Sequence, residues 1–236
     1  MSNKNSVTGK EVQTLFNRIA PVYDQMNNWL SFGQHRIWKL MAVKWSSPRP
    51  EDRAIDLCCG SGDLTQMLAR QVPQGRVYGV DFSQSLLALA SQRASAYSNI
   101  SWVEADVLDL PFEANYFDCA TMGYGLRNVR DIPRCLGELY RILKPGATAA
   151  ILDFHRPRAP VMEAFQRWYL DNIVVPTAQS FGLTEEYAYI MESLEKFPTG
   201  KEQVKLALET GFKLATHYPI ALGMMGVLVI SKEIVF

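Results

Sequence analysis

Residues 56–65 read Asp-Leu-Cys-Cys-Gly-Ser-Gly-Asp-Leu-Thr, and this stretch decides the fold. The apolar run at residues 54–59 leads into it and indicates a short buried strand. Gly60 and Gly62 then permit a tight turn, and apolar residues recur after it at helical spacing. The sequence therefore predicts a strand, a glycine turn, and a helix whose first backbone N–H groups face a ligand.

Strands and helices alternate beyond this turn, a pattern typical of a mostly parallel sheet with helices on both faces. Further strands are predicted at residues 76–81, 100–106, 117–123, 147–154, 213–219 and 225–232. Ser83 and Asp131 are expected to cap two helices, and Thr199 with Glu202 forms a capping box for a third. The prediction is an α/β fold with a seven-stranded, Rossmann-like sheet that binds ligands at the carboxyl ends of its strands.

Two stretches depart from the alternation. Residues 1–50 precede the first strand and are predicted to form an N-terminal helical cap. One stripe of its apolar residues recurs at helical spacing: Ile37, Trp38, Met41, Ala42 and Trp45. Residues 51–236 form the main domain, interrupted by an aromatic-rich insertion at about 157–198. Core packing is the ordinary interpretation of those aromatic side chains, and a helical lid over an apolar substrate is the alternative.

Composition and charge narrow the function. The 236 residues contain 24 Lys plus Arg and 24 Asp plus Glu, so no basic field exists to hold nucleic acid. No apolar run reaches the roughly 20 residues of a membrane span, and the polar N-terminus does not read as a signal peptide. A cytoplasmic chain, attached to a membrane only peripherally, is expected. Cys58, Cys59, Cys119 and Cys135 lack metal-ligand spacing and are expected to be small buried thiols, and no metal site is predicted.

Three acids and one threonine bear on the cofactor. A glycine turn followed by Asp81 at the next strand's end suits a dinucleotide or an adenosine cofactor, because the acid accepts hydrogen bonds from ribose in both. Thr65 stands where the dinucleotide fingerprint has a third glycine. Asp56 could meet a cationic amino group but would repel a phosphate, and Asp106 could reach an adenine amino group. The pattern favours S-adenosylmethionine over NAD.

Four ordered motifs carry a family resemblance. They are residues 16–24 (FNRIAPVYD), residues 31–39 (SFGQHRIWK), the opening turn, and residues 125–131 (GLRNVRD). With these motifs the sequence resembles the class I methyltransferases, and more narrowly the ubiquinone and menaquinone biosynthesis C-methyltransferases, over nearly its whole length. Within that family it is most similar to members that methylate a phytylated naphthoquinone.

The resemblance implies a cofactor site at the carboxyl ends of the strands. Its expected residues are Asp56, Gly60, Gly62, Thr65, Asp81, Phe82, Asp106, the Val107 backbone and Gly123. Asp81 should hold the ribose, and Asp106 should border the adenine. Two positions depart from the family's pattern: many class I methyltransferases have glycine at the position of Cys58, and relatives often have serine at the position of Gly123.

The resemblance also implies the reaction, which is C-methylation of the ring of a reduced demethyl-naphthoquinol, converting 2-phytyl-1,4-naphthoquinol to phylloquinol. Loss of a hydroxyl proton makes the adjacent ring carbon nucleophilic, and a cation near the oxygen favours the phenolate. Arg127 is the first candidate for that cation. The candidate bases or ring-oxygen partners are Tyr23, Asp24, His35, Asp153 and His155, each with a structural hydrogen bond as the alternative.

The phytyl tail is too apolar to remain in water, so the cap and the insertion are expected to form an apolar entrance against a membrane. Oligomeric state is left open, a homodimer included. A demethyl-menaquinol or benzoquinol acceptor is the alternative, and a non-catalytic S-adenosylmethionine-binding subunit of a quinone-synthesis complex is a further one. An NAD oxidoreductase is the least favoured. The Tyr140 and Lys144 pair matches the catalytic pair of short-chain dehydrogenases, but it lies at a helix end and is better explained as structural.

Overall fold

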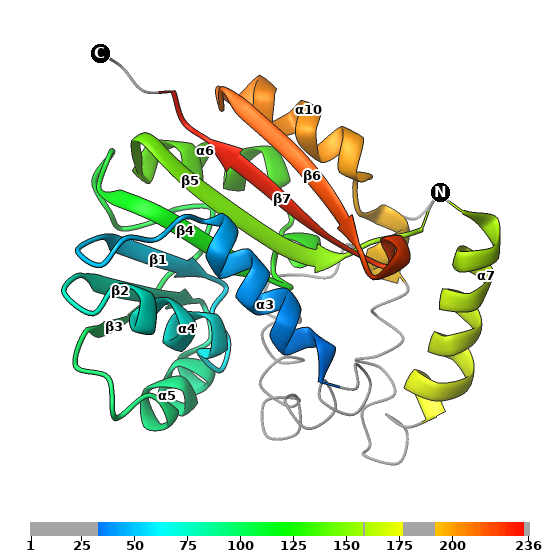
Figure 1. Cartoon of the computed structure of the whole chain (residues 1–236), viewed down its shortest axis with the longest axis horizontal. Coiled ribbons are helices and arrows are strands. Elements are labelled where there is room, and N and C mark those ends of the chain that lie inside the picture. Colours follow the sequence, from blue (N-terminus) through cyan, green and yellow to red (C-terminus); the bar gives the residue numbers. More distant parts are fainter. Residues whose placement is uncertain (1–32, 158, 177–191, 234–236) are drawn as a thin grey trace, which may run out of the picture.

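The computed structural model describes residues 33–157, 159–176 and 192–233. Its sheet has seven strands in the order β3-β2-β1-β4-β5-β7-β6 (Figure 1). The strands are β1 (Arg53–Leu57), β2 (Arg76–Asp81), β3 (Ile100–Glu104), β4 (Phe117–Gly123), β5 (Leu143–Phe154), β6 (Leu214–Ile220) and β7 (Met225–Ser231). β1 to β5 are parallel, and β7 runs antiparallel between β5 and β6. The predicted seven-stranded, mostly parallel sheet is confirmed.

Helices cover both faces of this sheet (Figure 1). One face carries α3 (Gln34–Trp45), α4 (Asp63–Gln71) and α5 (Gln84–Arg93), and the other carries α6 (Ile132–Ile142) and α10 (Gly200–Thr210). Further elements are η1 (Leu126–Asn128), α7 (Pro160–Tyr169), the π-helical η2 (Leu170–Val174) and η3 (Ala221–Gly223). The inward faces follow the helical spacing of apolar residues; on α6, for example, Leu136 and Leu139 are buried.

The predicted helix starts are confirmed by their hydrogen bonds. The Ser83 hydroxyl accepts from the backbone N–H of Leu86, and the Asp131 carboxylate accepts from that of Arg134. Thr199 and Glu202 form the reciprocal capping box at the start of α10. One predicted strand start is wrong in detail: β5 begins at Leu143 and not at residue 147, because Leu143 already pairs with Phe117 ahead of a shift in register.

The predicted apolar stripe of α3 is confirmed except at Ile37, because Ala42 belongs to a core cluster and the half-buried Trp38 and Trp45 pack against it. Ala42 is buried as expected, but Ile37 is 58% exposed, and the inward face also carries His35, Lys39 and Val43. The physical reason is a polar partner on α4, since Lys39 forms an ion pair with Asp63. Residues 1–32 lie outside the described residues, so the helical cap as a whole stays a prediction.

The described aromatic residues of the insertion divide between core and surface: Phe197 is buried in the main core, whereas those of α7 are not fully buried. Gln166, Leu170 and Val174 are the buried residues of α7 and η2, whereas Phe165 and Trp168 are exposed. Three more aromatic residues of the insertion, Phe181, Tyr187 and Tyr189, lie outside the described residues. Within the described ranges, no helix is long and apolar enough to cross a bilayer.

The four cysteines are free thiols. Cys59, Cys119 and Cys135 are buried and Cys58 is half-buried, which confirms their expected character. Burial raises the pKa of Cys135 to about 12, so this thiol stays protonated at neutral pH.

Candidate functional site

The order of the strands reverses between β1 and β4, which are neighbours in the sheet. In doubly wound sheets the ligand crevice forms outside the carboxyl ends of the strands at this point. The turn between β1 and α4 begins there, and β4 ends there at Gly123. The expected cofactor residues are therefore brought to one edge of the sheet.

Gly60 forms the open part of the turn. Its φ angle is +54°, and a Cβ atom placed on it would meet nothing within 4 Å. The backbone N–H of Gly60 donates to Asp81 Oδ2 at 2.9 Å, which ties the turn to the end of β2. Because this position needs glycine for its backbone and faces open space, Gly60 leaves room for close approach of a ligand.

Gly62 has a second, structural reason to be glycine. Its φ angle is +86°, and a Cβ atom there would lie 2.8 Å from the indole of Trp102 on β3. The same indole would lie 2.5 Å from a Cβ atom on Gly79. Trp102 therefore packs beneath the turn in a space that two glycines leave open, a contact the sequence pattern did not indicate.

Cys58 adopts φ +51°, a left-handed conformation that favours glycine. This explains why many class I methyltransferases have glycine at the position. The thiol is accommodated because Gly125 lacks a side chain: a Cβ atom on Gly125 would lie 2.5 Å from that of Cys58.

Asp56 lies beneath the turn and is fully buried. Its two carboxylate oxygens accept hydrogen bonds from the hydroxyls of Thr65, at 2.7 Å, and Thr121, at 2.8 Å. Burial raises the pKa of Asp56 to about 7. This geometry differs from the expected contact with a cationic amino group, because Asp56 and Thr65 hold the first turn of α4 to β1 and β4 instead.

Asp81 ends β2 with its carboxylate fixed from two sides. Besides Gly60, the backbone N–H of Ser83 donates to it at 3.0 Å. Burial raises the pKa of Asp81, and these N–H groups oppose the shift. Phe82 follows as a half-buried residue.

Asp106 lies two residues beyond the end of β3 at Glu104, so the predicted strand end at residue 106 is too late, and its side chain is half-exposed. It accepts from the backbone N–H of Leu108 at 2.9 Å and pairs with Arg130 at 3.2 Å. The adjacent Val107 is buried. Asp106 thus borders the crevice from the side opposite to β4.

Gly123 ends β4 against α4. A Cβ atom on Gly123 would lie 2.5 Å from Leu64 Cδ1, so the packing of Leu64 accounts for glycine where relatives often have serine.

These residues fit an adenosine-type cofactor. Asp81 and Asp106 supply acceptors for hydroxyl and amino groups, and Gly60 leaves the turn open. A pyrophosphate would meet these same acids without a partner of opposite charge, which disfavours a dinucleotide.

Arg127 and Asp153 come together on the β5 side of the crevice. Both side chains are buried in an ion pair, and the Arg127 backbone N–H donates to the other Asp153 oxygen at 2.9 Å. Arg127 Nε donates to the Ser193 hydroxyl at 2.9 Å, and the guanidinium lies 5.0 Å from the Phe154 ring centre. Burial raises the pKa of Asp153, and Arg127 opposes that shift.

The candidate bases His35 and His155, which the structure describes, interact with other residues. The charge of His35 contributes to lowering the pKa of Asp63 at the start of α4. Tyr23 and Asp24 lie outside the described residues. His155 Nε2 lies 3.0 Å from His217 Nε2, and burial, followed by the charges of His217 and Arg127, lowers the pKa of His155 to about 3.

Sequence reasoning missed two contributions. Ser193, from the end of the insertion, holds Arg127, and no local pattern marks it. Asp63 holds Lys39 Nζ at 2.6 Å. The spacing of His35 and Lys39, four residues apart on one helix, could have indicated a shared polar face.

The Tyr140 and Lys144 pair has the structural role that was expected. Tyr140 packs edge-on against Phe212, with ring centres 5.2 Å apart, and lies beneath Lys232. Lys144 pairs with Asp118 at 2.6 Å. Both side chains therefore interact with structural partners, as expected.

The profile of the ubiE/COQ5 methyltransferase family matches residues 4–232. The 2-phytyl-1,4-naphthoquinone methyltransferase of Trichormus variabilis is 66% identical over 226 residues, covering 94% of this chain and 99% of that protein. The Synechocystis enzyme of that name is 57% identical over 229 residues, covering 95% and 96%. The chloroplastic 2-phytyl-1,4-beta-naphthoquinone methyltransferase of Arabidopsis thaliana is 51% identical over 228 residues, covering 94% and 87%.

Solved structures share the fold at low sequence identity. A SAM-dependent methyltransferase of Thermotoga maritima aligns with a TM-score of 0.65 at 18% identity, covering 93% of this chain and 99% of that one. One of Aquifex aeolicus aligns with a TM-score of 0.60 at 15% identity, covering 86% and 92%.

Proposed function

The chain belongs to the ubiE/COQ5 methyltransferase family, and we propose that this S-adenosylmethionine-dependent enzyme methylates the ring of 2-phytyl-1,4-naphthoquinol, forming phylloquinol. The observation that carries the choice of acceptor is 66% identity to a 2-phytyl-1,4-naphthoquinone methyltransferase over almost the full length of both chains. Two alternative acceptors remain for comparison: demethyl-menaquinol, which differs in the tail, and benzoquinol, which differs in the ring.

The acceptor must be reduced, because only a hydroquinol can lose a hydroxyl proton and concentrate negative charge on the adjacent ring carbon. When bound, S-adenosylmethionine supplies a methyl group on a sulfonium. The ring carbon would take that methyl group, and the electrons of the broken carbon–sulfur bond would stay on sulfur. The proton on the methylated carbon then leaves, which restores the aromatic ring.

Arg127 is proposed to stabilise the phenolate. A guanidinium offers N–H donors and a positive charge but no acceptor, so it acts by electrostatics and not as a free base. Asp153 holds one Nη atom and Ser193 holds Nε. Within the described ranges Nη2 has no hydrogen-bond partner, and it is the donor left for a ring oxygen.

Asp153 is proposed as the residue that positions Arg127. Both of its oxygens are engaged, one by the guanidinium and one by the Arg127 backbone N–H, and the Phe154 N–H adds a third hydrogen bond. A carboxylate with this set of donors is poorly placed to take a proton from substrate. Tyr23, Asp24 and His35 stay as candidates for that proton transfer.

Five residues mark the cofactor's place in this proposal: Gly60, Gly62, Asp81, Asp106 and Gly123. Asp81 would accept from the ribose hydroxyls, and Asp106 with the Val107 backbone would border the adenine. Asp56 and Thr65 would act indirectly, by fixing α4 beneath the turn.

Helix α7 is proposed to rest against a membrane and to receive the apolar tail. Val161, Phe165 and Trp168 are four and three residues apart, so they share one helix face, and they are 79%, 45% and 53% exposed. An exposed apolar row of this kind is typical of a surface that meets lipid or another apolar partner.

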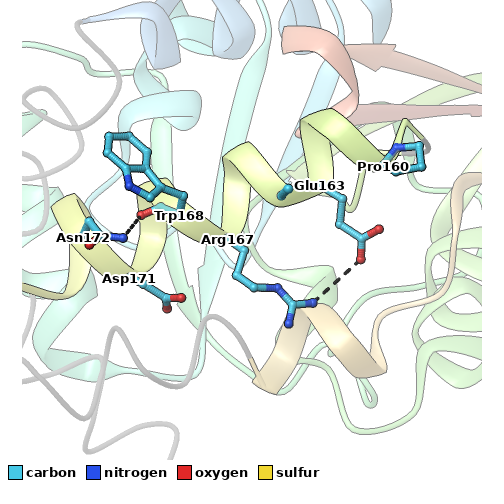
Figure 2. Close-up of a pocket in the computed structure, with 7 residues that line it drawn as sticks. Pro160, Glu163, Arg167, Trp168, Asp171 and Asn172 are labelled. Atoms are coloured by element: carbon cyan, nitrogen blue, oxygen red, sulfur yellow. Dashed lines mark hydrogen bonds and ion pairs between the residues drawn. The ribbon is translucent and has the colours of Figure 1, made fainter.

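The neighbouring face of α7 is polar. A hollow of about 500 Å³ runs along it, lined by Pro160, Glu163, Ala164, Arg167, Trp168, Asp171 and Asn172 (Figure 2). Glu163 and Arg167 point toward one another there (Figure 2). Trp168 belongs to both faces, which suits a side chain at the boundary between lipid and water.

The activity is tested with labelled S-adenosylmethionine and four acceptors: reduced and oxidised 2-phytyl-1,4-naphthoquinone, demethyl-menaquinol and demethyl-benzoquinol. Product is expected with the reduced phytyl substrate and not with its oxidised form. Arg127→Ala should reduce kcat by about 100-fold or more with cofactor binding intact, and Arg134→Ala, at an exposed residue of α6, is the matched control. Equal turnover of the Arg127→Ala protein would contradict the assigned role.

Membrane contact is tested separately by flotation with lipid vesicles. Val161→Ser, Phe165→Ser and Trp168→Ser combined should reduce the floating fraction. Leu208→Ser with Leu214→Ser, at exposed leucines of α10 and β6, is the control. Equal flotation of the α7 variant and the control would count against the proposal.

A further inference from the structure

Lys39 and Asp63 form an ion pair that has no part in the catalytic and cofactor-binding roles described above. Lys39 Nζ donates to Asp63 Oδ2 at 2.6 Å, with the two side chains 7% and 33% exposed. Burial raises the pKa of Asp63, but the charge and hydrogen bond of Lys39, together with the charges of Arg93 and His35, bring the pKa below its usual value. A buried ion pair gains little stability over apolar residues of similar size, so stability alone does not account for this one.

The pair lies at the β4 side of the cofactor crevice. Asp63 is the first residue of α4, directly after the turn formed by Gly60 and Gly62. Lys39 Nζ lies 5.9 Å from the ring centre of Tyr124, which follows the last residue of β4. The Lys39 ammonium therefore lies between the glycine turn and the end of β4.

The direction of the cofactor follows from Asp81. That carboxylate ends β2, on the other side of β1, and is the expected partner of the ribose. A cofactor that places its ribose at β2 and lies across the crevice directs its amino-acid end toward β4. That end carries one α-carboxylate and one α-ammonium group.

The unused hydrogen-bonding capacity of the pair matches these two groups. Lys39 has three N–H donors, of which Asp63 takes one. Within the part of the chain that the structure describes, Asp63 Oδ1 accepts no hydrogen bond. We propose that Lys39 and Asp63 bind the amino-acid end of S-adenosylmethionine, Lys39 donating to the carboxylate and Asp63 accepting from the ammonium. The proposal requires the cofactor alone and is independent of the ring that is methylated.

The test compares ligands that differ only at this end, by calorimetric titration of the full chain. S-adenosylhomocysteine carries both groups, its decarboxylated analogue lacks the carboxylate, and 5′-methylthioadenosine lacks both. Lys39→Met should weaken binding of S-adenosylhomocysteine by about 10- to 100-fold, the usual range for a charged hydrogen bond. It should leave the affinity for methylthioadenosine unchanged, because that ligand does not reach Lys39.

Two further variants sharpen the comparison. Asp63→Asn should weaken binding of both amine-containing ligands. Lys44→Met, at an exposed lysine of the same helix, should bind all three ligands as the parent does. Equal weakening of S-adenosylhomocysteine and methylthioadenosine by Lys39→Met would show a role in folding the turn only, and would overturn the proposal.

The unaltered protein gives a check that does not depend on a variant's folding. It should bind S-adenosylhomocysteine at least about tenfold more tightly than the decarboxylated analogue. Equal affinity for these two ligands would also overturn the proposal.

Discussion

His155 and His217 meet across strand β7, with their Nε2 atoms 3.0 Å apart, because Gly226 between them has no side chain. A Cβ atom on Gly226 would lie 2.2 Å from His217 Nε2 and 2.7 Å from His155 Cδ2. Gln203 of α10 lies 3.4 Å from the same His155 nitrogen. The pair therefore joins β5, β6 and α10 beside the insertion.

We expect Gly226→Ala to destabilise the protein by about 1–3 kcal/mol, because the added methyl group must separate the two imidazoles. Gly137→Ala is the matched control, since Gly137 lies within α6 and its added Cβ would meet nothing within 4 Å. That control should stabilise the protein by about 0.5–1 kcal/mol. Urea unfolding measures both, and a shift of the same sign in the two variants would contradict the packing argument.

The loss of folding stability at acid pH should depend on His155. Its pKa is lowered from 6.5 to about 3, so the unfolded chain binds a proton more readily than the folded one. Stability is therefore fully present above about pH 6.5 and falls as pH drops toward 3, by up to about 1.4 kcal/mol per pH unit. His155→Gln should reduce this acid loss in unfolding measured from pH 7 to 4. An unchanged acid slope would show that His155 protonates freely in the folded protein.

The raised pKa of Asp56 predicts the opposite dependence of folding stability on pH. Its pKa is raised from 3.8 to about 7, so the folded state binds the proton more tightly, and stability falls as pH rises between those values. Asp56→Asn removes the titration while an amide can still bond the hydroxyls of Thr65 and Thr121. The variant should therefore gain stability relative to the parent between pH 5 and pH 8. A constant difference over that range would contradict the burial of a titrating carboxyl group.

The two glycines of the turn should respond differently to alanine. Gly60→Ala costs about 1–2 kcal/mol for its left-handed backbone, and its added methyl group enters open space where a ligand would lie, so cofactor affinity should fall most. Gly62→Ala adds a clash with Trp102 and should reduce stability further. Replacing Trp102 with Phe in the Gly62→Ala background should restore part of that loss. Thermal unfolding and calorimetric binding separate the two effects, and equal losses of stability would contradict the assignment.

The pair of Arg127 and Asp153 gives a prediction on catalysis. Asp153→Asn leaves a buried guanidinium without its counter-charge, which should cost about 3–5 kcal/mol of stability and lower kcat more than it raises KM for the cofactor. The pH profile of kcat distinguishes a positioning residue from a base, because the titration of a catalytic base would produce the acid limb of that profile. Loss of that limb in Asp153→Asn would identify a base instead.

The sequence predicted those features that depend on neighbours in the chain. Alternating apolar runs located all seven strands, and the caps at Ser83, Asp131 and Thr199 are formed by residues within one helical turn. Features that depend on distant partners were missed. Lys39 faces inward because Asp63 lies opposite, 24 residues away, and Asp56 is held by Thr121, 65 residues away on another strand.

The candidate site shows the same division. The acids that end β2 and follow β3 could be located by counting from the glycine turn, since parallel strands end at one edge. The orientation of Asp56 could not be located in this way, because a carboxylate before the turn can point to the ligand or beneath it. Only the hydroxyls of Thr65 and Thr121 decide between those orientations.

The place of β7 has a consequence for how the chain folds as it is synthesised. β7 lies inside the sheet between β5 and β6, yet it leaves the ribosome after the other six strands. Until it arrives, β5 has an open edge and β6 has no neighbour in the sheet. An open edge invites pairing with other chains, so the nascent protein is most prone to aggregate in the interval just before residues 225–231 emerge.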